Sequence, residues 1–342
     1  MRLQTPIIAL LLFASSAFAA HVAYSLALTA YASVAFTVRG PNIRYYPIDK
    51  KPEQITAYRV LTRIYDWDDA FPLTTAYVRH RLLSAPPHKR MLTIGSSLSW
   101  GYPMNHTKSL AGVLQESMGD SFAVADASTI GYGLEAVNYS LCHLRIASLK
   151  PTVLFIEIAT INAILRIAQG DSGIASGECS GNMRNIEEPL DYFGYFFKYP
   201  DGISYIARLR PSFSDRDGSR IMRKPNNIPR QYKYDVNEIE FKQDVIRNQV
   251  AAVLETATAS PGRIVVFFAP IHRPAYRQLG VDDAFIDAFV RLALDTCREY
   301  EQVICLEPFT DIEQEQNHFF NITHLNRNGM ERLAEKLIAT IQ

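Results

Sequence analysis

Three serines lie within four positions of the segment IGSSLSWG, residues 94–101, directly after a strongly apolar run. A serine held where a buried strand gives way to a helix can act as a nucleophile, provided that a base takes its proton and donors stabilise the oxyanion that forms. Ser97 is the candidate nucleophile. The candidate base is His324, in the segment NITHLNRNG directly before the last predicted helix. Either residue alone is more often a turn or surface residue, but together they predict serine-dependent acyl transfer.

Further polar groups follow the other predicted strands. The backbone N–H of Ser97, an N–H at Gly131 and the side chain of Asn162 are candidate donors to an oxyanion, because each stands after a separate strand. His272 and Arg273 end a fourth strand. They are candidates for binding an anionic or polar part of a substrate, and a solvated loop is the alternative.

Apolar runs that alternate with helical patterns must position these residues. The strand candidates are 90–95, 122–126, 152–158, 263–269 and 302–307, and the helix candidates are 107–120, 133–150, 282–300 and 326–341. Such alternation predicts an α/β fold of the flavodoxin-like three-layer α/β/α type, with a parallel sheet of about five strands. Ligands of such sheets bind at the carboxyl ends of the strands, where the candidate residues stand.

The amino-terminal part differs from the rest of the chain. Residues 1–40 contain no Asp, Glu or Lys, and their apolar stretches exceed the roughly 20 residues that span a bilayer. A small-residue AFA site also fits a cleaved signal peptide. We favour a membrane anchor over a cleaved signal or a buried helix, with the following domain outside the cytoplasm, because long downstream domains are often translocated whatever the flanking charge.

Three further regions follow. Residues 41–88 are predicted to be a connector with one helical stretch, and residues 89–342 to form the main domain. An insertion at about 165–235 is too long for a structureless loop and is predicted to be a lid or subdomain. The aromatic residues of this insertion are expected to form its hydrophobic core, and the alternative is a surface that stacks on sugars or faces the membrane.

Composition excludes several classes of function. The chain of 342 residues has 35 Lys and Arg and 35 Asp and Glu, so it lacks the basic surface typical of nucleic-acid binding. It has neither a phosphate-binding G-x-x-x-x-G-K-[ST] loop nor an H-E-x-x-H motif, and no cofactor or metal is expected. Four cysteines without C-x-x-C spacing make disulfides or single buried thiols: Cys142, Cys179, Cys297 and Cys305.

These blocks together resemble the SGNH (GDSL-like) hydrolases and acyltransferases. The segment GSSLS, residues 95–99, resembles the family's G-D-S-x-S block, Gly131 matches its glycine block, and ATIN, residues 159–162, loosely matches G-x-N-D. The segment NITH, residues 321–324, resembles the D-x-x-H block and is followed by the expected hydrophobic residue and N-x-x-G. The resemblance implies that Ser97 is the nucleophile and His324 the base.

Two positions depart from the family pattern. Ser96 replaces an Asp of the first block, and Asn321 stands where the family carries the Asp that orients the histidine. An Asn accepts a hydrogen bond but contributes no charge to the imidazolium. Three outcomes follow: a Ser–His dyad, another acid such as Glu313 or Asp311 beside the histidine, or a site without catalysis.

The anchor and the insertion are similar to those of envelope proteins that transfer D-alanine to teichoic acid or acetylate alginate. The resemblance implies O-acylation or deacylation of a cell-envelope glycan or polymer. Its partners would be an acyl donor, a glycan or lipid acceptor, the membrane and an envelope acylation complex. A lipid or carbohydrate esterase is the first alternative. The second, from another class, is a silent module that binds glycan or acts as a scaffold.

Overall fold

The computed structural model describes residues 78–79, 81–101, 104, 108–128, 134–158, 219, 221–222 and 242–342. All of them belong to one compact unit that spans Val78–Met183 and Ser212–Gln342. The predicted anchor, most of the connector and nearly all of the insertion lie outside the described residues. Within the described part, no helix is long and apolar enough to cross a bilayer.

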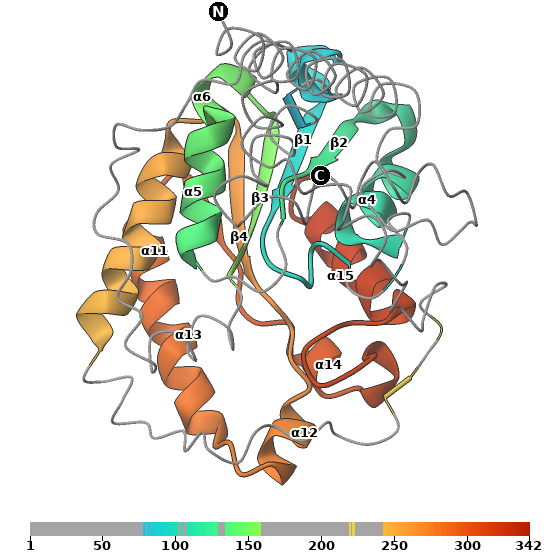
Figure 1. Cartoon of the computed structure of the whole chain (residues 1–342), viewed down its shortest axis with the longest axis vertical. Helices are drawn as coiled ribbons and strands as arrows, with labels where there is room; N and C mark the ends of the chain where they lie inside the picture. Colours follow the sequence, from blue (N-terminus) through green and yellow to red (C-terminus); the bar gives the residue numbers. More distant parts are fainter. Residues whose placement is uncertain are drawn as a thin grey trace, which may run out of the picture. The chain divides into compact units, whose positions relative to one another are not determined.

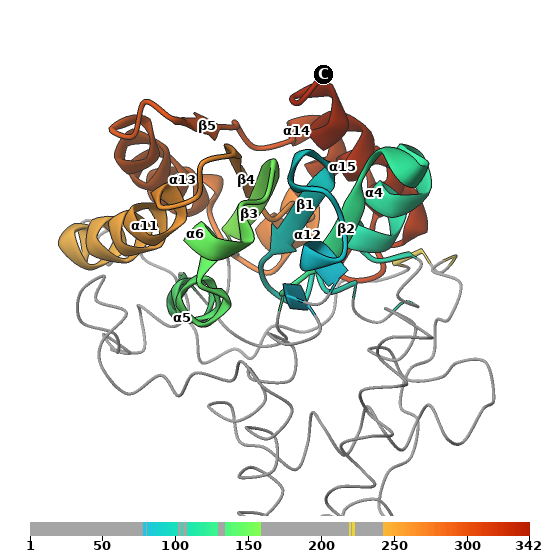
Figure 2. The same cartoon turned by 90° about the horizontal axis from the view of Figure 1, so that it is seen from above.

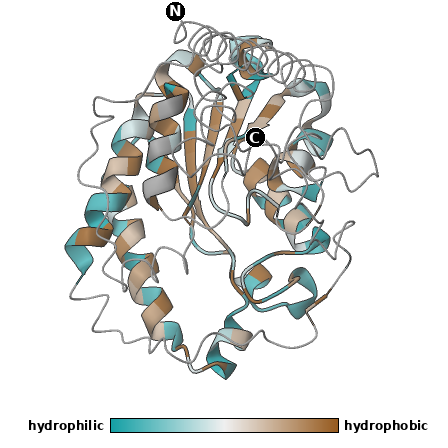
Figure 3. Ribbon diagram, in the orientation of Figure 1, coloured by the Kyte–Doolittle hydropathy of each residue, from teal (hydrophilic) through white to brown (hydrophobic). Residues whose placement is uncertain are grey.

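Within the described residues, five parallel strands form one sheet in the order β2-β1-β3-β4-β5 (Figure 1). The strands are β1 Arg90–Ile94, β2 Ala123–Asp126, β3 Val153–Ile158, β4 Arg263–Phe268 and β5 Val303–Cys305. Every residue of β1 and β3 is buried, and hydrophobic colour runs along the sheet (Figure 3). This is the burial that continuous apolar runs in parallel strands predict, and the five-stranded parallel sheet is confirmed.

Helices flank the sheet in two layers (Figure 2). On one face α4 (Leu110–Met118) packs against α15 (Arg327–Ala339), and on the other α11 (Gln243–Thr258) packs against both α5 (Leu134–Leu144) and α13 (Asp283–Arg298). The order reverses at β1, which lies between β2 and β3, so connections leave it in both directions. Such a switch point opens a crevice at the carboxyl end of β1, and the segment with Ser97 begins there.

Side-chain caps start α4 and α13, where the sequence places polar residues. Ser109 accepts a hydrogen bond from the Gly112 N–H at 3.1 Å before α4, and Asp282 accepts one from the Ala284 N–H at 3.0 Å before α13. Caps of this kind satisfy backbone donors that have no partner in the first helical turn. The remaining short elements are α6 Ile146–Leu149, α12 Arg273–Gln278, α14 Thr310–Glu313 and the 3-10 turns Pro87–Lys89, Gly119–Ser121 and Gln316–His318.

The structure differs from the sequence expectation in two helices. The predicted helix 133–150 is broken at Arg145, which adopts a left-handed backbone conformation with φ 48° and separates α5 from α6. Helix α11 was not among the expected elements, although its buried residues Ile246, Val250 and Val253 have helical spacing. The long unassigned stretch before it obscured this pattern.

Two helices on the same face of the sheet, α5 and α13, carry disulfide-bonded cysteines. Cys297 in α13 is bonded to Cys305 in β5, and Cys142 in α5 is also disulfide-bonded. For these residues the disulfide alternative holds over the single-thiol alternative. At the other end of the described part, Val78 and Leu82 are fully buried, so the last turns of the predicted connector belong to the folded unit.

Candidate active site

Ser97 and His324 lie together although 227 residues separate them in the sequence. The Oγ atom of Ser97 is 2.8 Å from Nε2 of His324, a hydrogen-bond distance. Ser97 follows β1 at the switch point of the sheet, and His324 is in the loop that precedes α15. Ser97 is buried and His324 is half-buried.

A tight turn directs Ser97 away from the strand. The Trp100 N–H donates to the Ser96 carbonyl at 3.0 Å, and the Gly101 N–H donates to the Leu98 carbonyl at 2.8 Å. Gly101 has φ 82° and lies so close to Ser109 that an added Cβ would be 2.6 Å from the Ser109 Cβ. The positive φ favours glycine because other residues rarely adopt it, and the close approach to Ser109 leaves no room for a Cβ atom.

The loop that carries His324 is tied at both of its ends. Phe319 and Leu325 form an antiparallel bridge, and Asn326 caps α15 by accepting a hydrogen bond from the Gly329 N–H at 3.1 Å. An added Cβ on Gly329 would be 2.2 Å from the carbonyl oxygen of His318. The N-x-x-G pattern therefore has a physical cause: the Asn starts the helix, and the Gly lets the helix approach the loop.

Asn321 orients the imidazole. Its Oδ1 is 3.0 Å from His324 Nδ1, and it also accepts hydrogen bonds from the backbone N–H groups of Thr323 and His324, both at 2.9 Å. Because an amide oxygen only accepts hydrogen bonds, this geometry assigns the proton to Nδ1 and leaves the lone pair of Nε2 facing the Ser97 hydroxyl. The Thr323 hydroxyl lies 3.0 Å from the same Nδ1.

Burial sets the protonation state of this histidine. It lowers the pKa of His324 from the usual 6.5 to about 4, because desolvation disfavours the imidazolium. The imidazole is therefore neutral near pH 7, as a proton acceptor must be. A carboxylate in place of Asn321 would oppose this shift by favouring the charged form.

The two acids considered as alternatives have other partners. Glu313 binds the guanidinium of Arg273 at 2.7 Å, and Asp311 binds Lys336 at 3.0 Å. Neither carboxylate is bonded to His324. Among the side chains that the structure describes, the amide of Asn321 takes the place of the orienting acid.

His272 and Arg273 have structural contacts. The Nδ1 of His272 accepts a hydrogen bond from the Ala275 N–H at 3.3 Å, and burial lowers the pKa of this imidazole. Arg273 forms ion pairs with Glu313 and, at 2.6 Å, with Asp287. These contacts hold the segment after β4 in place, and a role of His272 and Arg273 in substrate binding stays a prediction.

Of the three predicted oxyanion donors, the backbone N–H of Ser97 is the one that lies within the described residues. Around it, the N–H groups of Ser96 and Ser99 donate to a side-chain carboxylate, and the Leu98 N–H donates to the Ser96 hydroxyl. The Ser97 N–H has no acceptor among the described residues. The other two predicted donors, Gly131 and Asn162, lie outside the described residues.

That carboxylate belongs to Glu157, a residue that sequence reasoning missed. It is fully buried in β3, where the segment VLFIEI reads as an apolar strand with one acid. Its Oε2 accepts hydrogen bonds from the N–H of Ser96 at 3.2 Å and of Ser99 at 2.9 Å, and its Oε1 accepts one from the Ser96 hydroxyl. The signal available in the sequence was a charged residue within a strand that is otherwise apolar.

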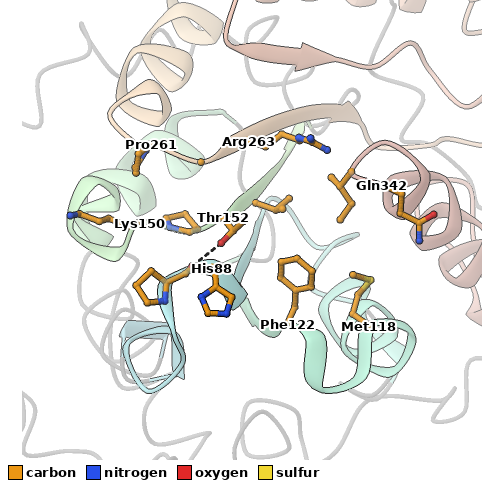
Figure 4. Close-up of a pocket in the computed structure, with 13 residues that line it drawn as sticks. His88, Met118, Phe122, Lys150, Thr152, Pro261, Arg263 and Gln342 are labelled. Atoms are coloured by element: carbon orange, nitrogen blue, oxygen red, sulfur yellow. Dashed lines mark hydrogen bonds between the residues drawn. The ribbon is translucent and has the colours of Figure 1, made fainter.

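A hollow of about 690 Å³ opens at the amino ends of the strands, away from Ser97 (Figure 4). Among the residues that line it, Thr152 precedes β3, Arg263 begins β4 and Phe122 precedes β2. These are the amino ends of the strands, whereas Ser97 lies beyond a carboxyl end. The hollow is therefore not part of the Ser–His site. In the described ranges, no cluster of three His, Cys, Asp or Glu side chains could hold a metal ion.

Comparison with known proteins returned solved structures only. No protein-family profile matches the chain, and no curated protein matches it. A Streptococcus pneumoniae structure named as a proposed platelet activating factor is 14% identical, covers 79% of this chain and 91% of its own, and has a TM-score of 0.42. The psychrotrophic esterase EstA from Pseudoalteromonas is 13% identical over 74% of this chain and 96% of its own, with a TM-score of 0.35. A carbohydrate acetylesterase family member from Sinorhizobium meliloti is 12% identical over 74% of this chain and 97% of its own, with a TM-score of 0.36.

Proposed function

We propose that this protein is an enzyme of serine-dependent acyl transfer. The observation that carries the proposal is the hydrogen-bonded series from Ser97 Oγ through the His324 imidazole to the Asn321 amide oxygen. A nucleophile, a base and a group that orients the base are the parts that covalent acyl transfer requires. The free N–H of Ser97 supplies a donor for the oxyanion.

In the proposed reaction, Nε2 of His324 takes the proton from Ser97 Oγ as this oxygen attacks the acyl carbonyl carbon. The negative oxygen of the tetrahedral intermediate accepts a hydrogen bond from the Ser97 N–H, and Gly131 and Asn162 are the further donors expected from the family resemblance. The imidazolium then returns its proton to the departing alcohol, which leaves an acyl-serine. A second alcohol or water attacks the acyl-serine by the reverse sequence.

The acceptor we propose is a hydroxyl group of a cell-envelope glycan or polymer. Two observations support an exported domain: the absence of Asp, Glu, Lys and Arg between Arg2 and Arg39, and the disulfides at Cys142 and between Cys297 and Cys305, which persist in oxidising compartments. Water as the acceptor gives the esterase alternative. A second candidate function is a silent glycan-binding module. The observation in its favour is the missing negative charge at Asn321.

Labelling with a fluorophosphonate probe tests the nucleophile directly. The purified full-length chain is expected to label, and Ser97→Ala is expected to abolish labelling. Ser140→Ala is a matched control, because Ser140 is also buried and its hydroxyl has no hydrogen-bond partner in the described part of the chain. Wild-type protein that never labels, or Ser97→Ala protein that still labels, would refute the proposed enzyme.

A further inference from the structure

Glu157 is a buried acid that the proposed mechanism does not use. It is fully buried, and none of the described basic side chains is bonded to it. Isolated charge in a protein interior is costly unless hydrogen bonds compensate it. In agreement, burial raises the pKa of the Glu157 carboxyl, while hydrogen bonds from Ser96 and Ser99 act in the opposite direction.

All the compensating donors come from the turn that carries Ser97. Strand β3 pairs with β1 in the register Ile156 to Ile94, so Glu157 stands level with Gly95 at the start of the turn. Its two oxygens accept the N–H groups of Ser96 and Ser99 and the hydroxyl of Ser96. A single side chain thus connects the first and last residues of the Ser96–Ser99 turn.

Ser96 extends this connection by one more bond. While its hydroxyl donates to Glu157, the same oxygen accepts the Leu98 N–H at 3.3 Å. Three of the four N–H groups in the turn are thereby occupied, and the fourth belongs to Ser97. The arrangement leaves the N–H of the nucleophile itself available for an oxyanion.

Gly95 makes room for this carboxylate. An added Cβ at Gly95 would lie 2.5 Å from both Cβ and Oε2 of Glu157. Cβ atoms in real structures essentially never come this close to non-bonded atoms. The glycine before the serines therefore has a local physical cause, which is the approach of the acid from the neighbouring strand.

We propose that Glu157, together with Ser96, is a positioning residue that holds the Ser96–Ser99 turn so that the Ser97 N–H stays free for the oxyanion while Ser97 Oγ faces His324. The inference rests on the proposed function. It adds a role for a strand residue that touches neither the substrate nor the histidine.

Glu157→Gln is the sharpest test, because it keeps the size and one acceptor oxygen. The new NH₂ group faces the Ser96 hydroxyl, so one of the three hydrogen bonds must be rearranged. We expect kcat for p-nitrophenyl acetate to fall about tenfold to a hundredfold, as for a misplaced catalytic group, with KM little changed. We expect the melting temperature to stay the same or rise, because a buried charge is removed.

Arg90→Met is the matched control. Arg90 is also buried and charged, but it stands at the amino end of β1, away from Ser97, and its replacement leaves the carbonyls of Ala85 and Leu149 without this donor. The melting temperature should fall, while kcat per folded molecule stays close to the wild-type value. This pair of variants separates positioning of the turn from general stabilisation.

Ser96→Ala tests the same connection from the other end and decides the matter if Glu157→Gln fails to fold. Its kcat should also fall, and the double variant should lose less than the product of the two single losses, because both act on one turn. An active wild type whose kcat is unchanged in the folded variants would overturn this inference alone. A wild type that neither hydrolyses the ester nor labels would overturn the proposed function and this inference with it.

Discussion

An amide oxygen accepts the hydrogen bond from His324 Nδ1 at the position where many serine hydrolases have a carboxylate. The amide supplies one part of the role of such an acid, since it fixes the tautomer and the ring orientation. It supplies no negative charge for the imidazolium that forms in the transition state. Asn321 thus aligns the Ser–His pair without adding charge. The histidine of this pair is weakly basic, because burial lowers its pKa to about 4.

Asn321→Asp should make His324 more basic. The base must be neutral, so kcat/KM falls as the pH drops through the pKa of His324, which is about 4 in the wild type. A neighbouring carboxylate raises that pKa, so the acid limb of the pH profile should move upward and kcat at pH 8 should rise about tenfold or more.

Profiles of kcat/KM between pH 3.5 and pH 9 provide the measurement. Asn317→Asp is the control, because Asn317 is exposed and its side chain has no bond to His324. An acid limb at the same pH in Asn321→Asp and the wild type would contradict the assignment of His324 as the base.

Ser97→Ala and His324→Ala should each lower kcat by about a thousandfold or more, because the two residues act as one unit. For the same reason, the double variant should be about as slow as either single variant. Hydrolysis of a simple acyl ester measures all three variants. Losses that multiply in the double variant would mean that the two residues act independently, against the 2.8 Å contact between them.

At the scale of elements, the site is a meeting of three segments. The turn after β1 carries Ser97, the neighbouring strand β3 supplies Glu157, and the loop before α15 presents His324. The backbone of this loop is further anchored where the His272 N–H donates to the Ile322 carbonyl at 2.9 Å. Placement of the histidine therefore depends on how closely α15 and the segment after β4 pack on the loop.

Gly329→Ala should disturb that placement. The added methyl group would meet the His318 carbonyl at 2.2 Å, so α15 must shift away from the loop. Overpacking of this kind costs about 1–3 kcal/mol of unfolding free energy, and kcat should fall as well. Denaturant unfolding and ester hydrolysis measure the two effects.

Asn328→Ala is the control, because it introduces the same residue in the same helical turn at an exposed position. It should leave stability unchanged or slightly increased, since Ala favours helix. Equal behaviour of the two variants would show that the close approach at Gly329 does not matter.

At the scale of the whole molecule, the disulfides and the absence of Asp, Glu, Lys and Arg between Arg2 and Arg39 both favour the proposed export. Cys297–Cys305 joins α13 to β5, and Cys142 of α5 is disulfide-bonded as well. Cytosolic thiols are kept reduced, so a chain with these bonds fits export. The proposed envelope acceptor depends on this location.

Thiol trapping in growing cells tests the location. Cysteines of the full-length chain should resist alkylation until a reductant is added, and the protein should fractionate with the membrane. A truncated chain without residues 1–40 should remain in the cytoplasm with alkylated thiols. Full-length protein that is soluble, uncleaved and freely alkylated would refute the exported envelope enzyme.

Local patterns in the sequence were sufficient to predict the strands and to single out Ser97 and His324, which the structure brings together in the candidate site. Continuous apolar runs bounded by turn residues predicted all five strands, since buried parallel strands require such runs. Ser97 and His324 stood out because each follows a predicted strand or precedes a predicted helix. The break at Arg145 was missed because a single left-handed residue has a weak local signal, and helix α11 was missed because it follows a long stretch without an assigned element.

The tertiary structure alone decided which groups surround the candidate site. Glu157 lies 61 residues from Ser96 in the sequence, and its role depends on β3 lying beside β1. The same holds for Arg273, whose partner Glu313 is 40 residues away in the sequence. The charge of Arg273 is balanced by this carboxylate within the fold. Hydrophobic periodicity sets which face of an element is buried, but strand order and loop packing set which polar groups meet.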